Sequence, residues 1–197
     1  KINKFIYASS SSVYGNSIGI NSENQKLLPL SPYAQTKISN EKDASKITKR
    51  GKTIFIGLRL FNIFGKNQNF NSPYSAVLIK WINLLKKGKK IKIYGDGKNS
   101  RDFCHVNNVI LAILLIVKKN FKKNKIYNVA SGKSIDLNSL SKLLIKHFAR
   151  NKKFFNLILY TQFKKGDIVY SKANINRITK DLNFKPIFKL KNEIKKL

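Results

Sequence analysis

The segment that most constrains the fold is a strand, a helix and a second strand in succession. Residues 4–10, "KFIYASS", form a short apolar run that ends in serines, and residues 53–61, "TIFIGLRLF", are rich in β-branched and aromatic side chains. Both runs are typical of buried strands. The segment between them predicts a helix, with Ser31 as N-cap, Pro32 at the first helical position and Gly51 just past the end. Two strands joined by a helix form the crossover unit of parallel sheets, so the sequence predicts the α/β class.

The rest of the chain continues this alternation of strands and helices. Hydrophobic periodicity predicts further helices near residues 74–87, 106–118, 137–149 and 172–182. Apolar runs predict further strands near residues 91–94, 126–130 and 157–161. No internal repeat and no low-complexity linker interrupts the pattern, and 197 residues are enough to bury a real core.

The net charge of +31 first suggests nucleic acid, an anionic membrane surface or an anionic substrate as partner. Only five of the 40 basic residues are Arg, and the 35 Lys are scattered among Asn and Ile. Because guanidinium is the preferred group for bidentate recognition of phosphates and bases, the composition predicts no specific nucleic-acid partner. A basic nucleic-acid module stays open as a weaker alternative, and it would bind DNA with a steep dependence on salt.

Cysteine, histidine and hydropathy patterns disfavour several other classes. Cys104 is the single cysteine and cannot form an internal disulfide, and no signal peptide or apolar run of 18 residues is present. The sequence therefore predicts a cytoplasmic protein that does not associate with membranes. His105 and His147 together with Cys104 give no metal-ligand spacing, so no metal is expected. No Gly-x-Ser-x-Gly nucleophile elbow is present either.

Tyr33 and Lys37 are the first candidates for chemistry. At positions i and i+4 of the predicted helix they share one face, so the ammonium can lie near the phenol. A nearby cation stabilises a phenolate, which is how a phenol with a reference pKa of about 10 becomes a usable base. The spacing alone is a weak signal. With 8 Tyr and 35 Lys in the chain, chance predicts about 1.4 Tyr-x-x-x-Lys pairs, and the chain has three.

Context separates these three pairs. Tyr94 opens a Gly-Asp-Gly turn and Tyr160 closes a predicted strand, so only Tyr33 and Lys37 lie on a predicted helix. That helix follows a run of four serines, residues 9–12, at the carboxyl end of a strand, where ligands bind in open α/β sheets. An ordinary serine-rich loop is the alternative interpretation of this run.

Six sequence blocks, spread in order over nearly the whole chain, carry a family resemblance: "YASSSSVYG", "LSPYAQTK", "GLRLFNIFG", "IYGDGKNSRDFCHV", "YNVASG" and "KKGDIVYSKANI". They resemble the extended short-chain dehydrogenase/reductase family. More narrowly they are similar to nucleotide-sugar 4-epimerases, and most of all to the UDP-N-acetylglucosamine 4-epimerases of surface-polysaccharide synthesis. The resemblance implies an NAD-dependent isomerase that acts on a UDP-sugar.

The same resemblance implies the fold and its division. It predicts the C-terminal part of a Rossmann-like doubly wound parallel sheet plus a smaller α/β substrate-binding region. Residues 1–65 would form the distal part of the NAD-binding domain and residues 66–105 a substrate-binding segment. Residues 106–131 would return to the NAD-binding domain, and residues 132–197 would form a C-terminal substrate-binding region.

The resemblance assigns three catalytic residues, which would also contact the cofactor and, for Ser10 and Tyr33, the substrate. Tyr33 matches the family's base, and Lys37 matches the lysine that holds the nicotinamide ribose and tunes the tyrosine. Ser10 matches the serine or threonine that hydrogen-bonds the sugar hydroxyl and relays its proton. The implied cycle removes the 4-hydroxyl proton through Tyr33 and Ser10 while hydride passes from C4 to NAD. The 4-keto sugar then turns over in the pocket and takes the hydride back on its other face.

The resemblance also assigns binding residues around the cofactor and the diphosphate. Phe61 matches a residue that lines the nicotinamide pocket, and Asn62 matches an asparagine whose amide contacts the substrate diphosphate. Arg101 matches the arginine that clamps this diphosphate. The alternative for Arg101 is an ion pair with Asp102, although a diphosphate favours a bidentate guanidinium.

Further substrate contacts are expected from later segments. Tyr94 is similar to the aromatic residue that packs on the uracil, with a core tyrosine as its alternative. Val77 and Lys80, on the predicted helix after "NSPY", are weaker substrate-side candidates. Lys164 and Asp167 stand where the family commonly has Arg and Asp to grip the diphosphate. A lysine point charge in place of a guanidinium fork can weaken substrate binding.

Two sequence positions distinguish between the enzymes and substrates of this family. Dehydratases of this fold have an Asp-Glu pair after the catalytic Ser or Thr, and UDP-xylose-forming decarboxylases also have a glutamate there. This chain has Ser11 and Ser12 at these positions, and Ser11 is also an expected substrate contact. Four residues after Asp167, epimerases limited to glucose and galactose have a bulky Tyr, and this chain has Ser171. A small residue there leaves room for a 2-acetamido group, so an N-acetylhexosamine or its uronic acid is the expected substrate.

The chain also departs from the family pattern. The family's usual Val-Asp-Asp after the arginine motif is Val106-Asn107-Asn108 here. The ten glycines include no Gly-rich phosphate loop, which the family carries on its first strand, roughly 100 residues before the serine strand. The chain is therefore expected to be the C-terminal fragment of an enzyme that is a homodimer when intact, and to be nearly inactive by itself. A UDP-glucose 4-epimerase, another nucleotide-sugar epimerase/dehydratase, or a truncated non-catalytic remnant stays open as an alternative.

Overall fold

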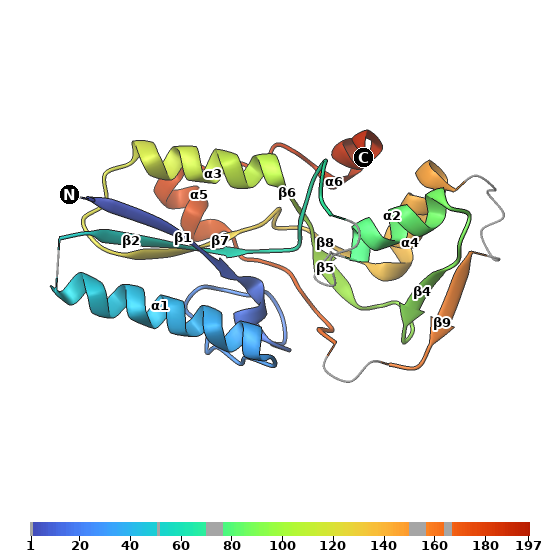
Figure 1. Cartoon of the computed structure of the whole chain (residues 1–197), viewed down its shortest axis with the longest axis horizontal. Helices are drawn as coiled ribbons and strands as arrows, with labels where there is room; N and C mark the ends of the chain where they lie inside the picture. The colour runs from blue at the N-terminus through green and yellow to red at the C-terminus, as the bar shows by residue number, and fades with distance from the viewer. Residues whose placement is uncertain (1, 51, 70–76, 150–156, 164–166) are drawn as a thin grey trace.

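The larger part of the molecule is built on three parallel strands. The computed structural model describes residues 2–50, 52–69, 77–149, 157–163 and 167–197. Its central strands are β1 (Lys4–Ser10), β2 (Ile54–Leu60) and β7 (Lys125–Val129), in the order β1-β2-β7. Helix α1 (Pro32–Arg50) covers one face of this sheet, whereas α3 (Val106–Lys118) and α5 (Asn176–Leu182) cover the other (Figure 1).

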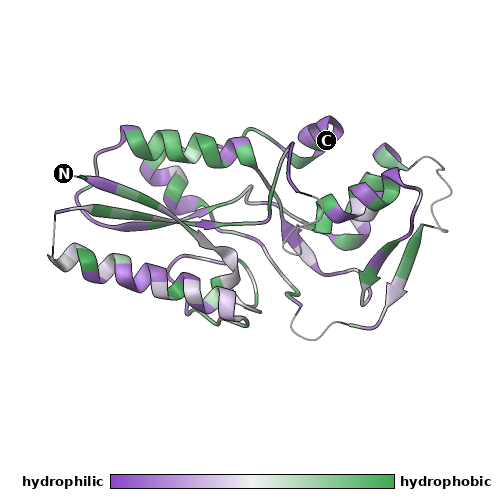
Figure 2. Cartoon of the chain, viewed as in Figure 1, coloured by the Kyte–Doolittle hydropathy of each residue, from purple (hydrophilic) through white to green (hydrophobic). Residues whose placement is uncertain are grey.

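The two faces of this sheet differ in polarity because successive side chains on a strand point to opposite faces. Ile56 and Leu58 of β2 pack with Tyr127 of β7 in the apolar core that α3 and α5 cover. Arg59 points the other way, toward Glu41 of α1. Figure 2 shows the consequence for the helices, since α3 is largely hydrophobic and α1 is largely hydrophilic.

The smaller part has its own core and its own sheet (Figure 1). Strand β4 (Ile91–Tyr94) pairs in parallel with β9 (Ile158–Thr161), and helix α2 (Val77–Lys86) packs against α4 (Leu137–Phe148). Two short ladders accompany these elements: β3 (Ile63–Phe64) with β6 (Cys104–His105) in parallel, and β5 (Ser100–Asp102) with β8 (Ser134–Asp136) antiparallel. The remaining elements are the 3-10 turns η1 (Ser11–Tyr14) and η3 (Ile194–Lys196) and the short helix α6 (Leu190–Glu193).

The structure confirms the α/β, Rossmann-like fold that the sequence predicts. Most helices and strands lie within a few residues of their predicted positions. The predicted start of the helix near 172–182 is wrong, because α5 begins only at Asn176. The segment before it is extended and pairs with Asn21, whose N–H donates to the Lys172 carbonyl at 2.8 Å while its own carbonyl accepts from Asn174 N at 2.8 Å. Gly51 and residues 74–76 lie outside the described residues.

The expected division of the chain stays a prediction, but the packing bears on its last segment. Within residues 132–197, α4 and β9 belong to the smaller part, where they contact α2 and β4. Helix α5 instead packs on β7, and its Ile178 and Leu182 join the core of the three-stranded sheet. The C-terminal segment therefore crosses from one part to the other and back.

Gly15 is the position where glycine is required most clearly. Its φ is +59°, and a Cβ there would lie 1.9 Å from the Leu28 carbonyl oxygen. Gly19 has a similar φ of +85° but nothing within 4 Å of its added Cβ. We expect Gly15→Ala to lower the free energy of unfolding by more than the about 1–3 kcal/mol of backbone strain alone. Gly19→Ala is the matched control for that strain, and equal losses in denaturant titrations of the two variants would contradict the prediction.

Candidate active site

The serine run lies at the carboxyl end of β1, as the sequence predicts. β1 ends at Ser10, which caps the following turn η1 by accepting hydrogen bonds from Ser12 N at 3.2 Å and Ser12 Oγ at 3.0 Å. Ser11 is part of the same turn and is half-buried. Ser9 points instead toward α1, and its hydroxyl donates to Glu41 Oε1 at 2.6 Å. The run is therefore an ordered turn at a strand end.

Helix α1 begins beside this strand end. Ser31 caps it as predicted, because Ser31 Oγ accepts from Ala34 N at 3.2 Å. Lys37 Nζ donates to the main-chain carbonyl of Ala8 in β1 at 3.2 Å and lies 5.5 Å from the centre of the Tyr33 ring. The Tyr33 side chain is 51% exposed. The structure thus places an open phenol and an anchored ammonium together at the carboxyl end of β1.

A buried ion pair holds α1 to the sheet, one turn beyond Lys37. Arg59 donates from Nε to Glu41 Oε1 at 2.9 Å and from Nη2 to Glu41 Oε2 at 2.7 Å. Both side chains are buried, at 4% and 7% exposure. Burial opposes the charge of Arg59, but the hydrogen bonds to Glu41 outweigh it and hold the pKa of the guanidinium above its usual value.

The network continues from Arg59 across the sheet. Arg59 Nη1 donates to Tyr14 Oη at 2.9 Å, and Tyr14 Oη donates to Asn128 Oδ1 of β7 at 2.6 Å. Burial raises the pKa of Tyr14 to about 12, so its hydroxyl keeps its proton at neutral pH. This network is not among the features that the sequence predicts. The sequence does contain one signal for it. Glu41 follows Lys37 by four residues, as Lys37 follows Tyr33, so Glu41 extends the same helix face by one turn.

Asn62 and Ser171 meet although 109 residues separate them. Asn62 follows β2 with a φ of +34°, and its Nδ2 donates to the Asp102 carbonyl at 3.0 Å and to Ser171 Oγ at 3.5 Å. Ser171 is 5% exposed. The two expected substrate contacts are therefore adjacent and hydrogen-bonded to each other.

Arg101 and Asp167 also come together, 66 residues apart. Arg101 Nη2 lies 2.8 Å from Asp167 Oδ1, and Asn99 Nδ2 donates to Asp167 Oδ2 at 3.0 Å. The Arg101 side chain is 12% exposed. Burial lowers the pKa of this guanidinium, and the charge of Asp167 opposes the shift. The predicted diphosphate residues Arg101 and Asp167 thus form one unit, whereas Lys164 lies outside the described residues.

The alternative ion pair between Arg101 and Asp102 is wrong. Asp102 is completely buried, and its carboxylate accepts from Ser131 N at 2.9 Å, Ser131 Oγ at 2.7 Å and Ala173 N at 3.2 Å. Burial raises the pKa of this carboxyl, and these hydrogen bonds oppose the shift. Neighbours on a strand point to opposite faces, so Arg101 and Asp102 cannot pair side by side in β5.

The remaining expected residues are more dispersed. Phe61 is fully buried and its ring packs 6.0 Å from that of Tyr14, so its side chain offers no surface to a ligand in this structure. Tyr94 is exposed at the end of β4, and Val77 and Lys80 lie on α2, half-buried and exposed respectively. Their roles stay predictions.

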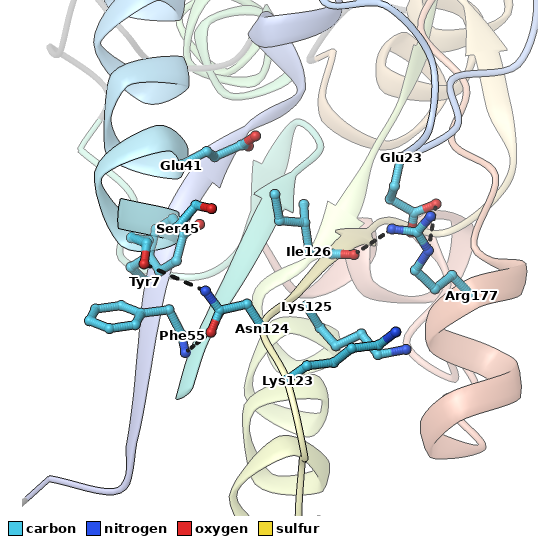
Figure 3. A pocket seen from close by; sticks show the side chains of 11 residues that line it. Tyr7, Glu23, Glu41, Ser45, Phe55, Lys123, Asn124, Lys125, Ile126 and Arg177 are labelled. Carbon is cyan, nitrogen blue, oxygen red and sulfur yellow. Dashed lines mark hydrogen bonds and ion pairs between the residues drawn. The ribbon is translucent and has the colours of Figure 1, made fainter. Parts of the chain in front are cut away.

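A cavity of about 420 Å³ lies on the α1 side of the sheet, apart from the expected site residues (Figure 3). Residues of α1, all three central strands and α5 line it, and none of the expected site residues does. Its charged groups are mostly paired within the protein. Arg177 donates to the Ile126 carbonyl at 3.3 Å and lies 3.9 Å from Glu23. Dashed lines mark both interactions in Figure 3. Glu23 also accepts from Asn128 N at 3.0 Å.

Within the described ranges, no group of three or more His, Cys, Asp or Glu side chains is arranged to hold a metal ion. Among the same residues, no helix is both long and apolar enough to span a bilayer.

Sequence comparisons identify related proteins. Residues 1–130 match the NAD dependent epimerase/dehydratase family. An uncharacterized protein of Methanocaldococcus jannaschii is 32% identical over 197 residues, covering 99% of this chain and 58% of that protein. Protein CapI of Staphylococcus aureus is 29% identical over 208 residues, covering 94% of this chain and 59% of that protein. The chain therefore spans about three fifths of the length of these relatives.

Three solved structures of nucleotide-sugar enzymes have a similar fold. A UDP-N-acetylglucosamine 4-epimerase from Methanobrevibacter ruminantium, in complex with UDP-N-acetylmuramic acid, has a TM-score of 0.86 and 34% identity, with 98% of this chain and 61% of that chain covered. A UDP-glucose 4-epimerase from Thermotoga maritima has a TM-score of 0.87 and 25% identity, with 98% and 61% covered. A UDP-glucuronic acid 4-epimerase from Bacillus cereus, with UDP-glucuronic acid and NAD, has a TM-score of 0.86 and 25% identity, with 98% and 60% covered.

Proposed function

Because this chain belongs to the NAD dependent epimerase/dehydratase family, we propose that it carries the catalytic and substrate-binding part of a UDP-N-acetylhexosamine 4-epimerase. The substrate is UDP-N-acetylglucosamine, UDP-N-acetylgalactosamine or a corresponding uronic acid. The full-length protein, meaning the complete reading frame that encodes these residues, is the enzyme, and it works as a homodimer in the cytoplasm.

One observation carries this proposal: the arrangement of Tyr33 and Lys37 at the carboxyl end of β1. Lys37 is anchored to Ala8, its ammonium lies 5.5 Å from the Tyr33 ring, and the phenol is open to solvent. Ser10 ends the same strand. A phenol beside a fixed cation and a strand-end hydroxyl can take a proton from a sugar hydroxyl bound between them.

The residues present fit the ribose and nicotinamide end of NAD. Lys37 and Tyr33 offer an ammonium and a hydroxyl at an open helix start, and both can hydrogen-bond ribose hydroxyls. When bound, NAD supplies reversible hydride acceptance at the sugar C4. Phe61 would line the nicotinamide pocket only in part, because its side chain is fully buried.

Arg101 and Asp167 form the diphosphate-binding unit of this proposal. Arg101 uses one Nη1 donor on the Ser100 carbonyl and one Nη2 donor on Asp167, which leaves further N–H groups for phosphate oxygens. Asp167 fixes the plane of the guanidinium, so a bidentate contact needs little further ordering. The substrate side is completed by five further residues: Asn62, Val77, Lys80, Tyr94 and Lys164.

The choice of an acetamido substrate rests on Ser171, a small residue where epimerases limited to glucose and galactose have a bulky Tyr. Ser11 and Ser12 carry no carboxyl group for water elimination, which favours an epimerase over a dehydratase. The Methanobrevibacter ruminantium enzyme, a UDP-N-acetylglucosamine 4-epimerase, shares 34% identity and supports this choice. The 25% identity to UDP-glucose and UDP-glucuronic acid 4-epimerases keeps those substrates as the competing candidates.

The direct test is an epimerisation assay with the full-length protein and NAD. UDP-N-acetylglucosamine, its uronic acid and UDP-glucose are compared, with the 4-epimer measured by NMR. We expect conversion of at least one acetamido substrate with a kcat/KM about tenfold or more above that of UDP-glucose. Faster conversion of UDP-glucose would reject the substrate assignment, and a dehydrated 4-keto product would reject the epimerase itself.

Replacing Arg101 tests the diphosphate unit. We expect Arg101→Lys to weaken UDP binding to the full-length protein by about tenfold or more, because an ammonium keeps the charge but loses the planar fork. Arg177→Lys is the matched control, since Arg177 also lies near a carboxylate but on α5. Calorimetric titration with UDP measures both. Equal affinities for the two variants would contradict the role of Arg101.

A further inference from the structure

Ser9 has no role in the proposed chemistry, although it directly precedes Ser10 at the end of β1. The residue is 2% exposed, and its hydroxyl donates to Glu41 Oε1 at 2.6 Å. This distance is in the short range that is typical of a hydroxyl donating to a carboxylate. A strong, buried contact between β1 and α1 therefore lies one residue away from a proposed catalytic group.

Glu41 joins both strands to α1 at one level of the sheet. Ser9 and Arg59 are partners in the register of β1 and β2, and the next pair, Ser10 with Leu60, ends both strands. Glu41 Oε1 accepts from the Ser9 hydroxyl and from Arg59 Nε at 2.9 Å, whereas Oε2 accepts from Arg59 Nη2 at 2.7 Å. The carboxylate therefore fixes the helix one residue pair before the strand ends that carry the site.

Two side-chain hydrogen bonds join β1 to α1 within the part of the chain that the structure describes. One runs from Lys37 Nζ to the Ala8 carbonyl at 3.2 Å, and the other from Ser9 to Glu41. They use successive residues of β1 and side chains one helical turn apart on α1. Lysine reaches its acceptor through a long flexible stem, whereas a serine hydroxyl is placed by one torsion angle. The Ser9 contact is therefore the stiffer of the two.

We propose that Ser9 is a positioning residue, which holds β1 against α1 so that Ser10 and Tyr33 reach the same sugar hydroxyl. This inference rests on the proposed function and deepens it, because Ser9 itself does not touch the substrate. Ser10 directly follows Ser9, and Tyr33 lies on the helix that Glu41 fixes. Proton transfer requires hydrogen-bond distances, and a misplacement of about 1 Å can lower a rate by about 10²-fold.

Ser9→Ala in the full-length protein removes the hydroxyl and little volume. We expect kcat for the preferred UDP-sugar to fall by about tenfold or more, because Ser10 and Tyr33 lose their alignment. KM should stay within about twofold, since other residues bind the UDP-sugar. Ser9→Thr keeps the hydroxyl donor, so it is expected to hold kcat within about threefold of the unmodified protein.

Thr48→Val is the matched control, because Thr48 also holds α1 through a hydroxyl, but at the opposite end of the helix from Tyr33. Asn124 Nδ2 donates to Thr48 Oγ1 at 2.7 Å, and this asparagine lies directly before β7. A general loosening of the helix would lower kcat in both variants, whereas a positioning role lowers it only in Ser9→Ala. Denaturant titrations give the stability losses against which the two kcat values are compared.

Crystal structures of the two variants separate this inference from the epimerase assignment. In Ser9→Ala we expect the distance from Lys37 Nζ to the Ala8 oxygen, 3.2 Å here, to exceed the hydrogen-bond limit of about 3.5 Å. In Thr48→Val it should not change. If the unmodified protein converts no UDP-sugar, the proposed function fails, and this distance still decides the role of Ser9.

Two kinds of result would overturn the proposal. With an active unmodified protein, an undiminished kcat in Ser9→Ala, or an equal fall of kcat in Ser9→Ala and Thr48→Val, would reject a positioning role. With or without activity, a contact between Lys37 and Ala8 that Ser9→Ala leaves unchanged would reject it as well.

Discussion

Tyr33→Phe in the full-length protein is expected to lower kcat by about 10²- to 10⁴-fold, the range of a positioned acid–base group. The substitution removes one hydroxyl and keeps the ring that lies 5.5 Å from Lys37 Nζ. UDP affinity should stay within about twofold, because the phenol acts on the sugar hydroxyl and not on the diphosphate. Turnover is measured by NMR of the 4-epimer, and affinity by calorimetry.

Tyr160→Phe is the matched control for this prediction. Tyr160 has the same spacing to a lysine four residues on, but it lies in β9 and its hydroxyl donates to Asn138 Oδ1 at 2.9 Å. It is 52% exposed, nearly the same as Tyr33. We expect turnover close to that of the unmodified protein. Undiminished turnover in Tyr33→Phe, or an equal loss in both variants, would reject Tyr33 as the base.

Glu41→Ala is expected to lower the free energy of unfolding by about 3–5 kcal/mol, because it leaves the buried Arg59 guanidinium without its partner. Ser9 loses its acceptor as well. A loss of this size is a large share of the 5–15 kcal/mol that typically stabilises a domain. Denaturant titration followed by circular dichroism measures the change.

The same helix offers the control. Asp43 lies 3.8 Å from Lys46, but both side chains are exposed, at 61% and 75%. Exposed pairs of this kind contribute about 1 kcal/mol or less, so Asp43→Ala should be nearly neutral. A double variant, Glu41→Leu with Arg59→Met, should recover much of the stability, because it removes both charges together. If Glu41→Ala costs no more than Asp43→Ala, the buried pair does not anchor α1.

The main elements of the fold could be predicted because their signals are local. The helix from Pro32 has its capping serine immediately before it, and Ser31 does cap it. β1 and β2 are apolar runs of ordinary strand length, and both were found near their predicted ends. The strands β3, β5, β6 and β8 have only two or three residues, so no periodicity could indicate them, and only their long-range pairing defines them.

The pairing of polar groups was harder to predict than the elements. Arg101 meets Asp167 and not its neighbour Asp102, because strand geometry turns adjacent side chains to opposite faces. Arg59 lies within an apolar run, and its partner Glu41 is on a helix, so their meeting depends on how α1 packs on the sheet. The capping of α3 by His105 Nδ1 depends on the orientation of the ring, which no sequence pattern states.

We propose that Tyr33, Lys37 and Ser10 serve an oxidation at C4 that is reversed within one site. The most direct measurement follows a deuterium label at C4 of UDP-N-acetylglucosamine during conversion by the full-length protein. We expect the 4-epimer to keep the deuterium at C4, with no net change in NADH absorbance. Replacement of the label by solvent hydrogen during each conversion would contradict it.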